Sequence, residues 1–487
     1  MADPVIVSCP ADVWTKVATN VTAGQVHIKD TRPGDYLQTY RMTGGAAPDA
    51  GDTSEGVKIT GPFALIEATA GIDVYIMPLG AAGSVRVDSA AAGAAAEMLY
   101  VGAAYNIVTD TWRRLGAAQG WPVGMFPGVQ ISPVFQALRR VALKDDGTVH
   151  KGISWLDFTK YEDGTSVDLT GGEGQIMVEY LPAYWKTDVV GDWYCILLSH
   201  LPLEGFALHP VFADSSAVYL GAYEASLVPG QTKLSSIARD PRDGTSPVWP
   251  VTTRSGDWGH AGLTAAVTDS LAEARGAGWQ QADLMTRHWE RLLMLVAFAG
   301  WNFQSMVGNG RTALTDGGWT NDVNIGRCGL GDATGGYHSA VQQGTTLGYL
   351  TDYAQVLGVE NTYGNVWDRV ASLVSDYAVY YKTKPPFNYA SVTGWTRLLN
   401  AVGVGLLLPT SNGYAGRPHS GLGIVFPADV TGSSSTMMTD YFYQAAGLRV
   451  FVVGGNAPLG SSAGPFYWYE LNAGSYASVG GRLTYKK

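Results

Sequence analysis

Short runs of alternating apolar and polar residues, separated by Gly, Pro, Asp and Thr, fill the first 88 residues of the chain. Alternation with a period of two predicts strands whose two faces meet different environments. Because the turn residues recur at short intervals, this segment predicts a small all-β sandwich or barrel. The expected strands are residues 5–9, 14–21, 25–30, 36–42, 57–61, 63–68, 72–79 and 84–88.

The next stretch, Ser89–Ala96, contains only serine, alanine and glycine. Such a sequence forms a flexible linker or the first turns of an alanine-rich helix. We expect a linker that becomes a short helix near Glu97. Residues 89–129 would then separate an N-terminal β-domain, residues 1–88, from a larger region, residues 130–487.

Mixed strands return in residues 130–230, where turn sequences at Asp145–Thr148 and Glu162–Gln175 predict hairpins before a half-buried strand. The segment Asp269–Phe303 predicts a helix that stops near Gly300. Its residues at helical spacing are Leu284, His288, Arg291, Leu292, Leu295, Val296 and Ala299.

Residues 304–487 are rich in glycine and predict few regular elements, with residues 308–339 as a long surface loop. Near the end, strands at Arg449–Val453 and Arg482–Tyr485 bracket a segment with four consecutive aromatics, Phe466–Tyr469. Binding surfaces favour Tyr, Ser, Gly and Asn, which predicts a display surface. The alternative is that these rings fill a core, although on a strand all four cannot face the same side.

Composition narrows the possible functions. Of the 487 residues, 46% are hydrophobic and only 15% are charged, which is too apolar for a disordered chain. The 62 glycines and 26 tyrosines favour tight turns and short strands. The net charge is −10, and the one basic run is Lys486–Lys487, so nucleic-acid binding is not expected.

Cysteine use and hydropathy suggest folding in a reducing cytosol. The three cysteines, Cys9, Cys195 and Cys328, lie far apart and match neither a disulfide framework nor zinc spacing. The N-terminus lacks the pattern of a secretory signal. The longest apolar stretch, Leu292–Trp301, has about half the length that a bilayer requires, so no membrane insertion is expected.

Catalytic and metal-binding patterns are weak. Gly460–Gly464 matches G-x-S-x-G, but the last histidine, His419, precedes Ser462, whereas a hydrolase needs a histidine after the serine. We therefore expect no catalytic residues and no cofactor. Calcium ligation is an open alternative, because acidic and amide side chains gather in one Gly-rich loop, although such residues usually make turns. These side chains are Asp316, Asn321, Asp322 and Asn324.

Several segments together resemble formylglycine-generating-enzyme-like domains, a variant of the C-type lectin fold. They are Met285–Leu292 (MTRHWERL), Asn361–Val370 (NTYGNVWDRV), Val453–Gly455 and Gly480–Leu483 (GGRL). The tail Ser462–Asn472 resembles the end of phage virion proteins, some of which carry this fold, and the architecture is similar to that of phage major tropism determinants. Residues 171–186, 198–212 and 219–226 resemble phage tail and host-contact proteins.

This resemblance implies a mostly β chain with an α+β C-terminal part, in which a small N-terminal β-sandwich or barrel precedes a C-type-lectin-like domain at residues 130–487. The active enzymes of the family use two cysteines in their C-terminal core. Here only Cys328 lies in the C-terminal third, so the resemblance does not extend to catalysis.

The function implied is that of a phage virion protein, a tail fibre or receptor-binding protein, that binds a host-surface polysaccharide or outer-membrane protein. The N-terminal domain would attach to other virion proteins, after assembly in the host cytoplasm. A capsid decoration or head-fibre protein is the alternative. A polysaccharide depolymerase is the third reading, although the β-helix repeats typical of such enzymes are absent. A homotrimer is expected, because several weak sites gain from multivalency.

The receptor-binding residues are expected between and beside the last two strands. Aromatic rings with hydrogen-bonding neighbours suit carbohydrate or mixed polar ligands. Strand alternation predicts that either Trp468 or the pair Tyr467 and Tyr469 points outward. The full set is Tyr467, Trp468, Tyr469, Asn472, Ser475 and Tyr476, with Tyr414, Arg417 and His419 from a Gly/Pro-rich loop.

Overall fold

A computed structural model describes the chain from Leu99 to Lys487, except residues 228–229, 231, 252–262, 314–324, 342–351, 400–402 and 477. Before Leu99 it describes the backbone of eight strands. The chain forms two compact units. The first holds Met1–Val101 with the short segments Leu115–Gln119 and Pro127–Gln136, and the second holds the remaining residues.

The first unit contains two four-stranded antiparallel sheets, in the orders β1-β8-β3-β6 and β2-β7-β4-β5. Strands of the two sheets contact each other, for example β2 with β8. The expected strand positions are confirmed to within one or two residues: β1 (Val5–Cys9), β2 (Thr15–Val21), β3 (Gly24–Asp30), β4 (Leu37–Thr43), β5 (Val57–Thr60), β6 (Phe63–Ala68), β7 (Ile72–Pro78) and β8 (Gly83–Ser89).

Two mainly antiparallel sheets are built from strands in the first half of the second unit together with the C-terminal strand. A five-stranded sheet has the order β10-β9-β15-β14-β16, and a six-stranded sheet has the order β12-β11-β13-β17-β30-β18. Their strands are β9 (Val101–Asn106), β10 (Thr111–Gly116), β11 (Arg139–Leu143), β12 (Val149–Ile153), β13 (Gln175–Tyr180), β14 (Tyr184–Val190), β15 (Trp193–Ser199), β16 (Ala207–Leu208), β17 (Val218–Gly221), β18 (Trp279–Gln281) and β30 (Leu483–Lys486).

The C-terminal half adds an eight-stranded sheet, β24-β23-β22-β27-β28-β26-β25 with β29 beside β22, and a three-stranded sheet, β19-β20-β21. In the larger sheet β22 pairs in parallel with β29, and β26 with β28. The strands are β19 (His338–Val341), β20 (Tyr353–Val356), β21 (Val359–Glu360), β22 (Trp367–Asp376), β23 (Ala378–Tyr381), β24 (Thr396–Arg397), β25 (Gly413–Tyr414), β26 (Tyr441–Tyr443), β27 (Arg449–Gly454), β28 (Gly464–Leu471) and β29 (Val479–Gly480).

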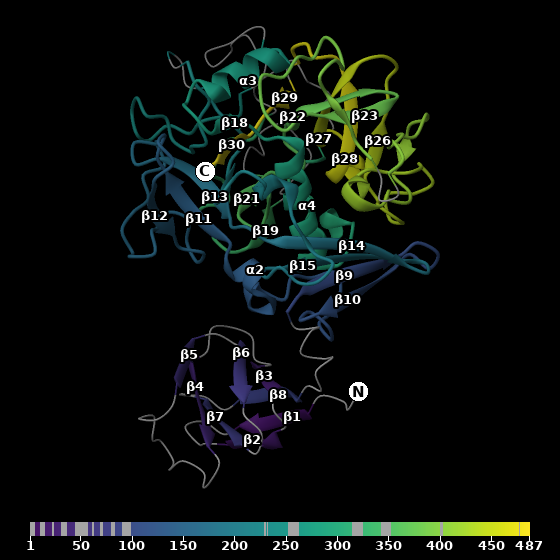
Figure 1. Cartoon of the computed structure of the whole chain (residues 1–487). Helices are drawn as coiled ribbons and strands as arrows, with labels where there is room; N and C mark the ends of the chain where they lie inside the picture. Colours follow the sequence, from purple (N-terminus) through teal and green to yellow (C-terminus); the bar gives the residue numbers. More distant parts are fainter. Residues whose placement is uncertain are drawn as a thin grey trace. The chain divides into compact units, whose positions relative to one another are not determined.

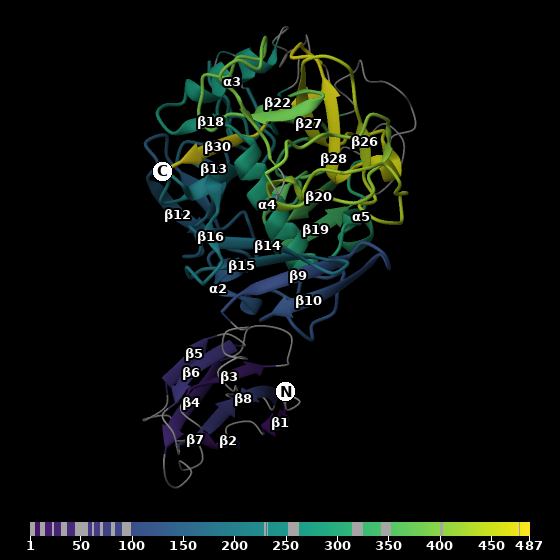
Figure 2. The same ribbon diagram turned by 45° about the vertical axis from the view of Figure 1, so that its right-hand side comes forward.

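One helix, α4 (Leu284–Phe298), lies inside the second unit, and all fifteen of its residues are buried. Figures 1 and 2 show it between the sheet of β14 and β15 and the sheet of β22, β27 and β28, and it contacts β15 and β22. The other helices are α2 (Pro133–Gln136), α3 (Ala265–Glu273) and α5 (Phe303–Met306), with short 3-10 turns η1 (Val129–Ile131), η2 (Pro210–Phe212), η4 (Gly421–Gly423) and η5 (Gly460–Ser462).

Burial of α4 requires partners for its polar side chains. His288 pairs with His209 through a bond of 2.8 Å between Nδ1 and Nε2, and the two rings stack at 5.1 Å. His209 is thereby a hydrogen-bonded structural residue. Burial lowers the pKa of both imidazoles, so the pair is neutral at pH 7.

Two sequence-based expectations about helices are corrected. Residues after Glu97 do not form a helix: the described part, from Leu99, makes the hairpin strands β9 and β10, and β9 is fully buried beside β15. Pairing in a sheet has overridden the helix propensity of the alanines and leucines. The expected helix at Asp269–Phe303 is two helices, α3 and α4, with β18 between them. Helix α4 ends at Phe298, close to the expected stop, with Ala299 in the left-handed region at φ 50°.

The C-terminal third is also more regular and more buried than expected. Residues 304–487 contain the strands β19 to β30. Within 308–339 the described residues Arg311, Thr312, Cys328 and Asp332 are each at most 3% exposed, so this run is not simply a surface loop. Strand β13, expected to be half-buried, is buried along its whole length.

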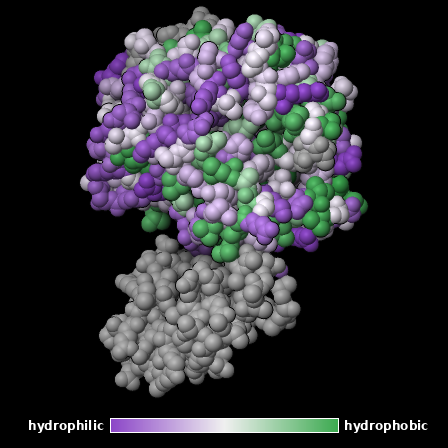
Figure 3. Space-filling model, viewed as in Figure 1, coloured by the Kyte–Doolittle hydropathy of each residue, from purple (hydrophilic) through white to green (hydrophobic). Residues whose placement is uncertain are grey.

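Apolar side chains at the surface are dispersed. On the face of the second unit seen in Figure 3, hydrophobic residues occur in separate groups among hydrophilic ones. None of the helices that the structure describes has the length and apolar character needed to cross a bilayer.

The start of α4 offers a test of how firmly the helix is held. Asp283 caps it, accepting bonds from Thr286 N at 2.8 Å, from Gln280 Nε2 at 2.6 Å and from Lys486 Nζ. We predict that Asp283→Ala lowers the free energy of unfolding by about 2 to 4 kcal/mol, because the cap is lost and the buried amide of Gln280 and the partly buried ammonium of Lys486 lose their acceptor. Urea denaturation measures this change.

The matched control is Thr264→Ala, which removes the cap of α3. That cap is a single bond of 3.4 Å to Val267 N near the surface. A cost below about 1 kcal/mol is expected there. Equal costs for the two variants would contradict the central role of Asp283.

Candidate functional site

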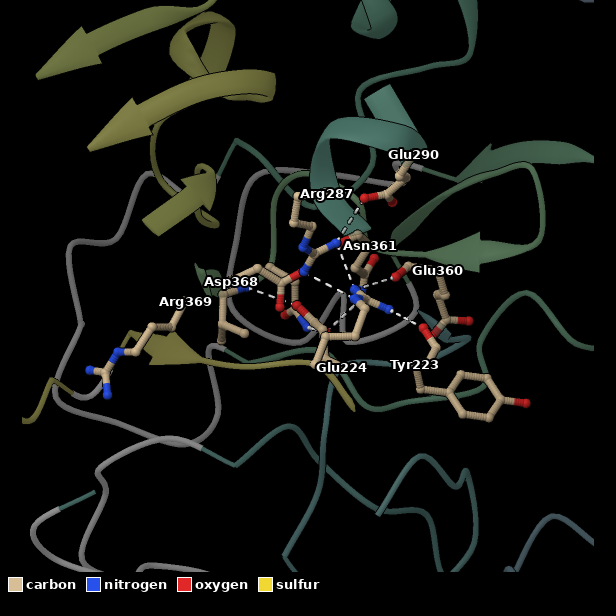
Figure 4. Close-up of polar contacts among 12 residues, drawn as sticks. Tyr223, Glu224, Arg287, Glu290, Glu360, Asn361, Asp368 and Arg369 are labelled. Carbon is tan, nitrogen blue, oxygen red and sulfur yellow. Dashed lines mark hydrogen bonds and ion pairs between the residues drawn. The ribbon is translucent and has the colours of Figure 1, made fainter. Parts of the chain in front are cut away.

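A network of charged side chains lies buried at the centre of the second unit. Asp368 of β22 accepts bonds from Arg287 of α4 at 2.5 Å and from Arg482 at 3.1 Å. Glu290, one turn after Arg287, accepts from Arg287 at 3.0 Å and also from Arg291. All these side chains are at most 3% exposed. Figure 4 shows Arg287 and Glu290 together on the helix, with Asp368 beside Arg287.

Arg482 ties the C-terminal segment into this network. Its Nη1 donates to Gly221 O at 3.1 Å, and its Nη2 donates to Glu360 O at 2.8 Å and to Asn361 O at 3.1 Å. One side chain therefore joins β17, β21, β22 and the segment before β30.

Carboxylates and amides extend the network away from α4. Glu224 accepts from Asn361 Nδ2 at 3.0 Å and from Asn365 Nδ2 at 2.6 Å. Glu360 accepts from the backbone amides of Gly329 and Gly331 at 2.8 and 2.9 Å. In Figure 4 Glu224 and Asn361 lie at the centre, whereas the Arg369 side chain and the Tyr223 ring point away from it.

Asp332, Arg140 and Tyr223 form a third part of the buried network. Asp332 accepts from Arg140 Nη2 at 2.9 Å and from the Tyr223 hydroxyl at 2.7 to 2.8 Å. The Arg140 guanidinium lies 4.0 Å from the centre of the Phe158 ring and 4.8 Å from that of Tyr223. Aromatic faces thus cover a buried cation whose charge is balanced by one carboxylate.

The surroundings of each carboxylate determine its protonation. Burial, reinforced by Asp368, raises the pKa of Glu224 to about 8, and burial with Asp332 raises that of Glu360 to about 7. Burial would raise the pKa of Asp368 as well, but Arg287 and Arg482 outweigh it and hold that pKa below its ordinary value. The charged form is therefore retained where two arginines meet one carboxylate.

The charged side chains of the network are almost completely buried, and they join α4, β17, β21 and β22 to the segment before β30. The segments singled out in the sequence meet here: Met285–Leu292 supplies Arg287 and Glu290, Asn361–Val370 supplies Asn361, Asn365 and Asp368, and Gly480–Leu483 supplies Arg482. Gly454 packs against the same region, since a Cβ there would lie 3.0 Å from Thr362 O.

An open pocket of about 470 Å³ lies on the eight-stranded sheet, next to Trp367 at the start of β22. Its walls combine aromatic rings, amides and two charged residues. Tyr443 and Tyr469, neighbours on β26 and β28, stack in parallel with centroids 4.3 Å apart, and Trp367 lies 5.3 Å from Tyr469. The other lining residues are Ala445, Arg449, Asn456, Pro458, Leu459, Glu470, Leu471, Asn472, Tyr476, Ser478 and Val479.

The loop that forms one wall of the pocket is held by specific bonds. Arg369 Nη2 donates to Gly474 O at 3.0 Å, and Ala265 N donates to Ala473 O at 3.0 Å. Val479 N closes the turn onto Tyr476 O at 3.2 Å. The pocket wall is therefore fixed to β22 and α3, and Tyr476 is presented from an anchored backbone.

Two of the expected binding residues belong to the core instead. Trp468 is fully buried, stacks on Phe426 at 4.3 Å and donates its indole N–H to Val425 O at 2.7 Å. Tyr467 is 3% exposed and packs edge-on against Trp367 at 4.7 Å. Trp468 and Tyr467 thus point into the core from opposite faces of β28, and of the Tyr467 and Tyr469 pair only Tyr469 is partly exposed, where it lines the pocket.

The structure brings Tyr469, Asn472 and Tyr476 together in the pocket. Ser475 is exposed on the same loop but does not line it. The residues of the Gly/Pro-rich loop lie outside it too: the Tyr414 hydroxyl contacts Ser461 at 3.2 Å, Arg417 pairs with Asp429 at 2.8 Å, and His419 Nε2 lies 3.0 Å from Leu407 O. The pocket therefore unites part of the expected set.

Several lining residues were missed by the sequence analysis, notably Trp367, Tyr443, Arg449 and Glu470. Tyr443 had a signal, since Tyr441–Tyr443 is an aromatic run like Phe466–Tyr469. Trp367 lies in Asn361–Val370, the segment that resembles a motif of the lectin-like fold, but the sequence offered no reason to expect it in a binding site. Arg449 and Glu470 carry no local signal, because their proximity depends on the pairing of β27 with β28.

The structure also locates most of the serine and cysteine candidates from the sequence. Ser461 and Ser462 lie in η5, and both hydroxyls contact Tyr414. Cys195 and Cys328 are buried free thiols. Within the described residues no group of three or more His, Cys, Asp or Glu side chains could hold a metal ion. Asp316, Asn321, Asp322 and Asn324 lie outside the described residues.

No protein-family model matches the chain, and no curated protein matches its sequence.

Because the network is buried, replacing one carboxyl oxygen in it by an amide nitrogen should strongly destabilise the protein. Replacing Asp368 by Asn keeps its shape but leaves Arg482 without a carboxylate partner and Arg287 with Glu290 alone, which Arg291 shares. We expect Asp368→Asn to lower the free energy of unfolding by about 3 kcal/mol or more, since an uncompensated buried cation is costly. Chemical denaturation followed by tryptophan fluorescence measures the loss.

The control for this variant is an exposed ion pair. Asp214 and Lys384 are 3.0 Å apart with both side chains 70% exposed. Asp214→Asn is expected to leave stability unchanged within error. A similar loss in both variants would show that the central network is not special.

A second pocket, of about 220 Å³, is lined by a carboxyl group that should make the stability of the protein depend on pH. Its lining includes Asp440, which is 3% exposed, and burial raises the pKa of this carboxyl to about 8. The folded chain then holds a proton that the unfolded chain releases above pH 4. The contribution of Asp440 to the free energy of unfolding is therefore complete below about pH 4. It decreases as the pH rises toward 8, by up to about 1 kcal/mol per pH unit.

Asp440→Asn should flatten this dependence, because the amide cannot ionise. Urea denaturation of both proteins at pH 5, 7 and 9 provides the comparison. The buried histidines act in the opposite direction below pH 6.5, where the unfolded state gains protons, so the effect of Asp440 is read above pH 6.5. Parallel curves for the two proteins from pH 7 to 9 would contradict this role.

Proposed function

We propose that this chain is a phage virion protein whose C-terminal region has a C-type-lectin-like arrangement and binds a receptor on the host surface. The observation that carries the proposal is the open pocket on the eight-stranded sheet. Stacked tyrosines, a tryptophan and an anchored loop with Asn472 and Tyr476 provide rigid aromatic contact area with adaptable hydrogen-bonding groups.

The buried network supports the proposal of a C-type-lectin-like arrangement. Segments that resemble motifs of that fold, far apart in the sequence, converge on Asp368 and Arg482. Convergence of this kind is expected if the segments were retained together as the centre of one fold. It supports the resemblance independently of the local sequence.

The chemistry of the pocket favours binding over cleavage. Hydrolysis of a glycosidic bond ordinarily requires two carboxyl groups facing the substrate. Among the lining residues Glu470 is the one acidic side chain, and its carboxyl group already accepts a bond from Ala445 N at 2.9 Å. We therefore prefer a receptor-binding role to that of a polysaccharide depolymerase.

In this proposal the first unit, with its two four-stranded sheets, attaches the protein to the particle, and a homotrimer presents several pockets at once. Imaging of particles labelled on this protein distinguishes a tail fibre from a capsid decoration protein. Label confined to the capsid lattice would overturn the tail assignment.

Pocket residues should be needed for attachment but not for folding. We predict that Tyr476→Ala and Asn472→Ala each weaken binding of the labelled protein to receptor-bearing bacteria by about tenfold. The melting temperature should change by less than about 3 °C, because both residues lie on the pocket wall. Flow cytometry over a panel of strains, with calorimetry on the same samples, measures both quantities.

Tyr377→Ala is the matched control, since this tyrosine is 63% exposed and lies outside the pocket. It should bind cells like the unchanged protein. If the pocket variants bind as well as this control, the receptor site lies elsewhere. If the unchanged protein labels no strain in a broad panel, the receptor-binding role itself is overturned.

A further inference from the structure

The pocket contains an arginine that lacks a partner of opposite charge. Arg449 Nη1 donates to Asn472 Oδ1 and weakly to Leu448 O at 3.5 Å. No described carboxylate forms an ion pair with it. Exposed Arg139, Arg242 and Arg417 pair with carboxylates at 2.6 to 2.8 Å, whereas exposed Arg397, like Arg449, has no such pair among the described residues. What distinguishes Arg449 is its place in the wall of the pocket.

The acidic residue of the pocket does not neutralise Arg449. Glu470 is 3% exposed, and its Oε2 accepts a bond from Ala445 N. Burial raises the pKa of its carboxyl group, and the charge of Arg449 acts to lower it. Because Glu470 is buried and Arg449 is only partly buried, the charged group that a ligand in the pocket can contact is Arg449.

The remaining surfaces suit a sugar ring. The parallel pair Tyr443 and Tyr469, with Trp367 beside it, presents flat apolar faces of the kind that pack against pyranose C–H groups. Asn456, which is 4% exposed, lines the same pocket, and its Oδ1 has no hydrogen-bond partner within the described part of the chain.

We propose that the ligand of this pocket is a saccharide that carries an anionic group, a carboxylate or a phosphate, and that Arg449 binds that group. This inference rests on the proposed function and specifies the receptor class. Guanidinium matches both kinds of oxyanion with two parallel hydrogen bonds, and the aromatic platform holds the ring to which the anion is attached. Neutral sugars can stack on the same platform but leave the guanidinium without a partner.

The test uses the full-length protein on an array of bacterial surface glycans printed in matched pairs. Each acidic glycan, with either a uronic acid or a sugar phosphate, is printed beside the form in which the anionic group has been removed or reduced. We expect the acidic member to bind about tenfold more tightly than its neutral partner. Raising the salt concentration from about 0.05 M to about 0.5 M should reduce that preference. The uronate and phosphate pairs show which anion is recognised.

Three variants test whether Arg449 causes the preference for acidic glycans. Arg449→Gln should lose the preference for the acidic member, and Arg449→Lys should keep part of it, because the charge remains but the planar fork is lost. Arg397→Gln, which removes an exposed arginine outside the pocket, should behave like the unchanged protein. Melting curves confirm that each variant is folded.

The outcomes separate this inference from the proposed function. Equal binding of acidic and neutral members by the unchanged protein overturns the inference and leaves receptor binding intact. So does a preference that survives in Arg449→Gln. If Arg449→Gln does not fold, the pairwise preference and its salt dependence in the unchanged protein still decide the matter. If no glycan binds at all while cells are labelled, the receptor is not a saccharide and the inference is wrong.

Discussion

The structure depends on how a fully buried helix accommodates four ionisable side chains. Helix α4 carries Arg287, His288, Glu290 and Arg291 in its middle, and none of them reaches solvent. An isolated charge in such a position would cost several kcal/mol, so each one needs a partner of fixed geometry. Asp368 of β22 supplies a partner for Arg287, Pro465 O supplies one for Arg291 and His209 supplies one for His288, while Glu290 accepts bonds from both arginines. The arrangement of the sheets around α4 follows from this requirement.

The same network places the pocket. Trp367 and Arg369 flank Asp368 on β22, so fixing Asp368 also fixes the ring that lies beside Tyr469 and the guanidinium that holds the loop at Gly474. A structural centre and a binding surface are thus built from adjacent residues of one strand. Because successive residues of a strand face opposite sides, one segment serves both tasks.

Rigidity is what makes a shallow pocket useful for recognition. Two tyrosines stacked in parallel and a loop held by backbone hydrogen bonds lose little conformational freedom when a ligand binds. The polar groups at the rim, Arg449 and Asn472, are bonded to each other and so are oriented in advance. Such a surface suits a repeated, modest contact with a sugar, strengthened when several copies bind together.

Local sequence alone determined the elements whose pattern is self-contained. Alternation identified strands β1 to β8 to within one or two residues, and helical spacing with Gly300 placed the end of α4. The helix expected after Glu97 was wrong, since the burial of β9 comes from β15, which lies about ninety residues later in the chain. Likewise, nothing near Trp468 reveals that Phe426 and Phe451 cover its ring. Which aromatics form the core, which line the pocket and which arginine joins them there were decided by long-range packing, because burial depends on neighbours that are distant in the sequence.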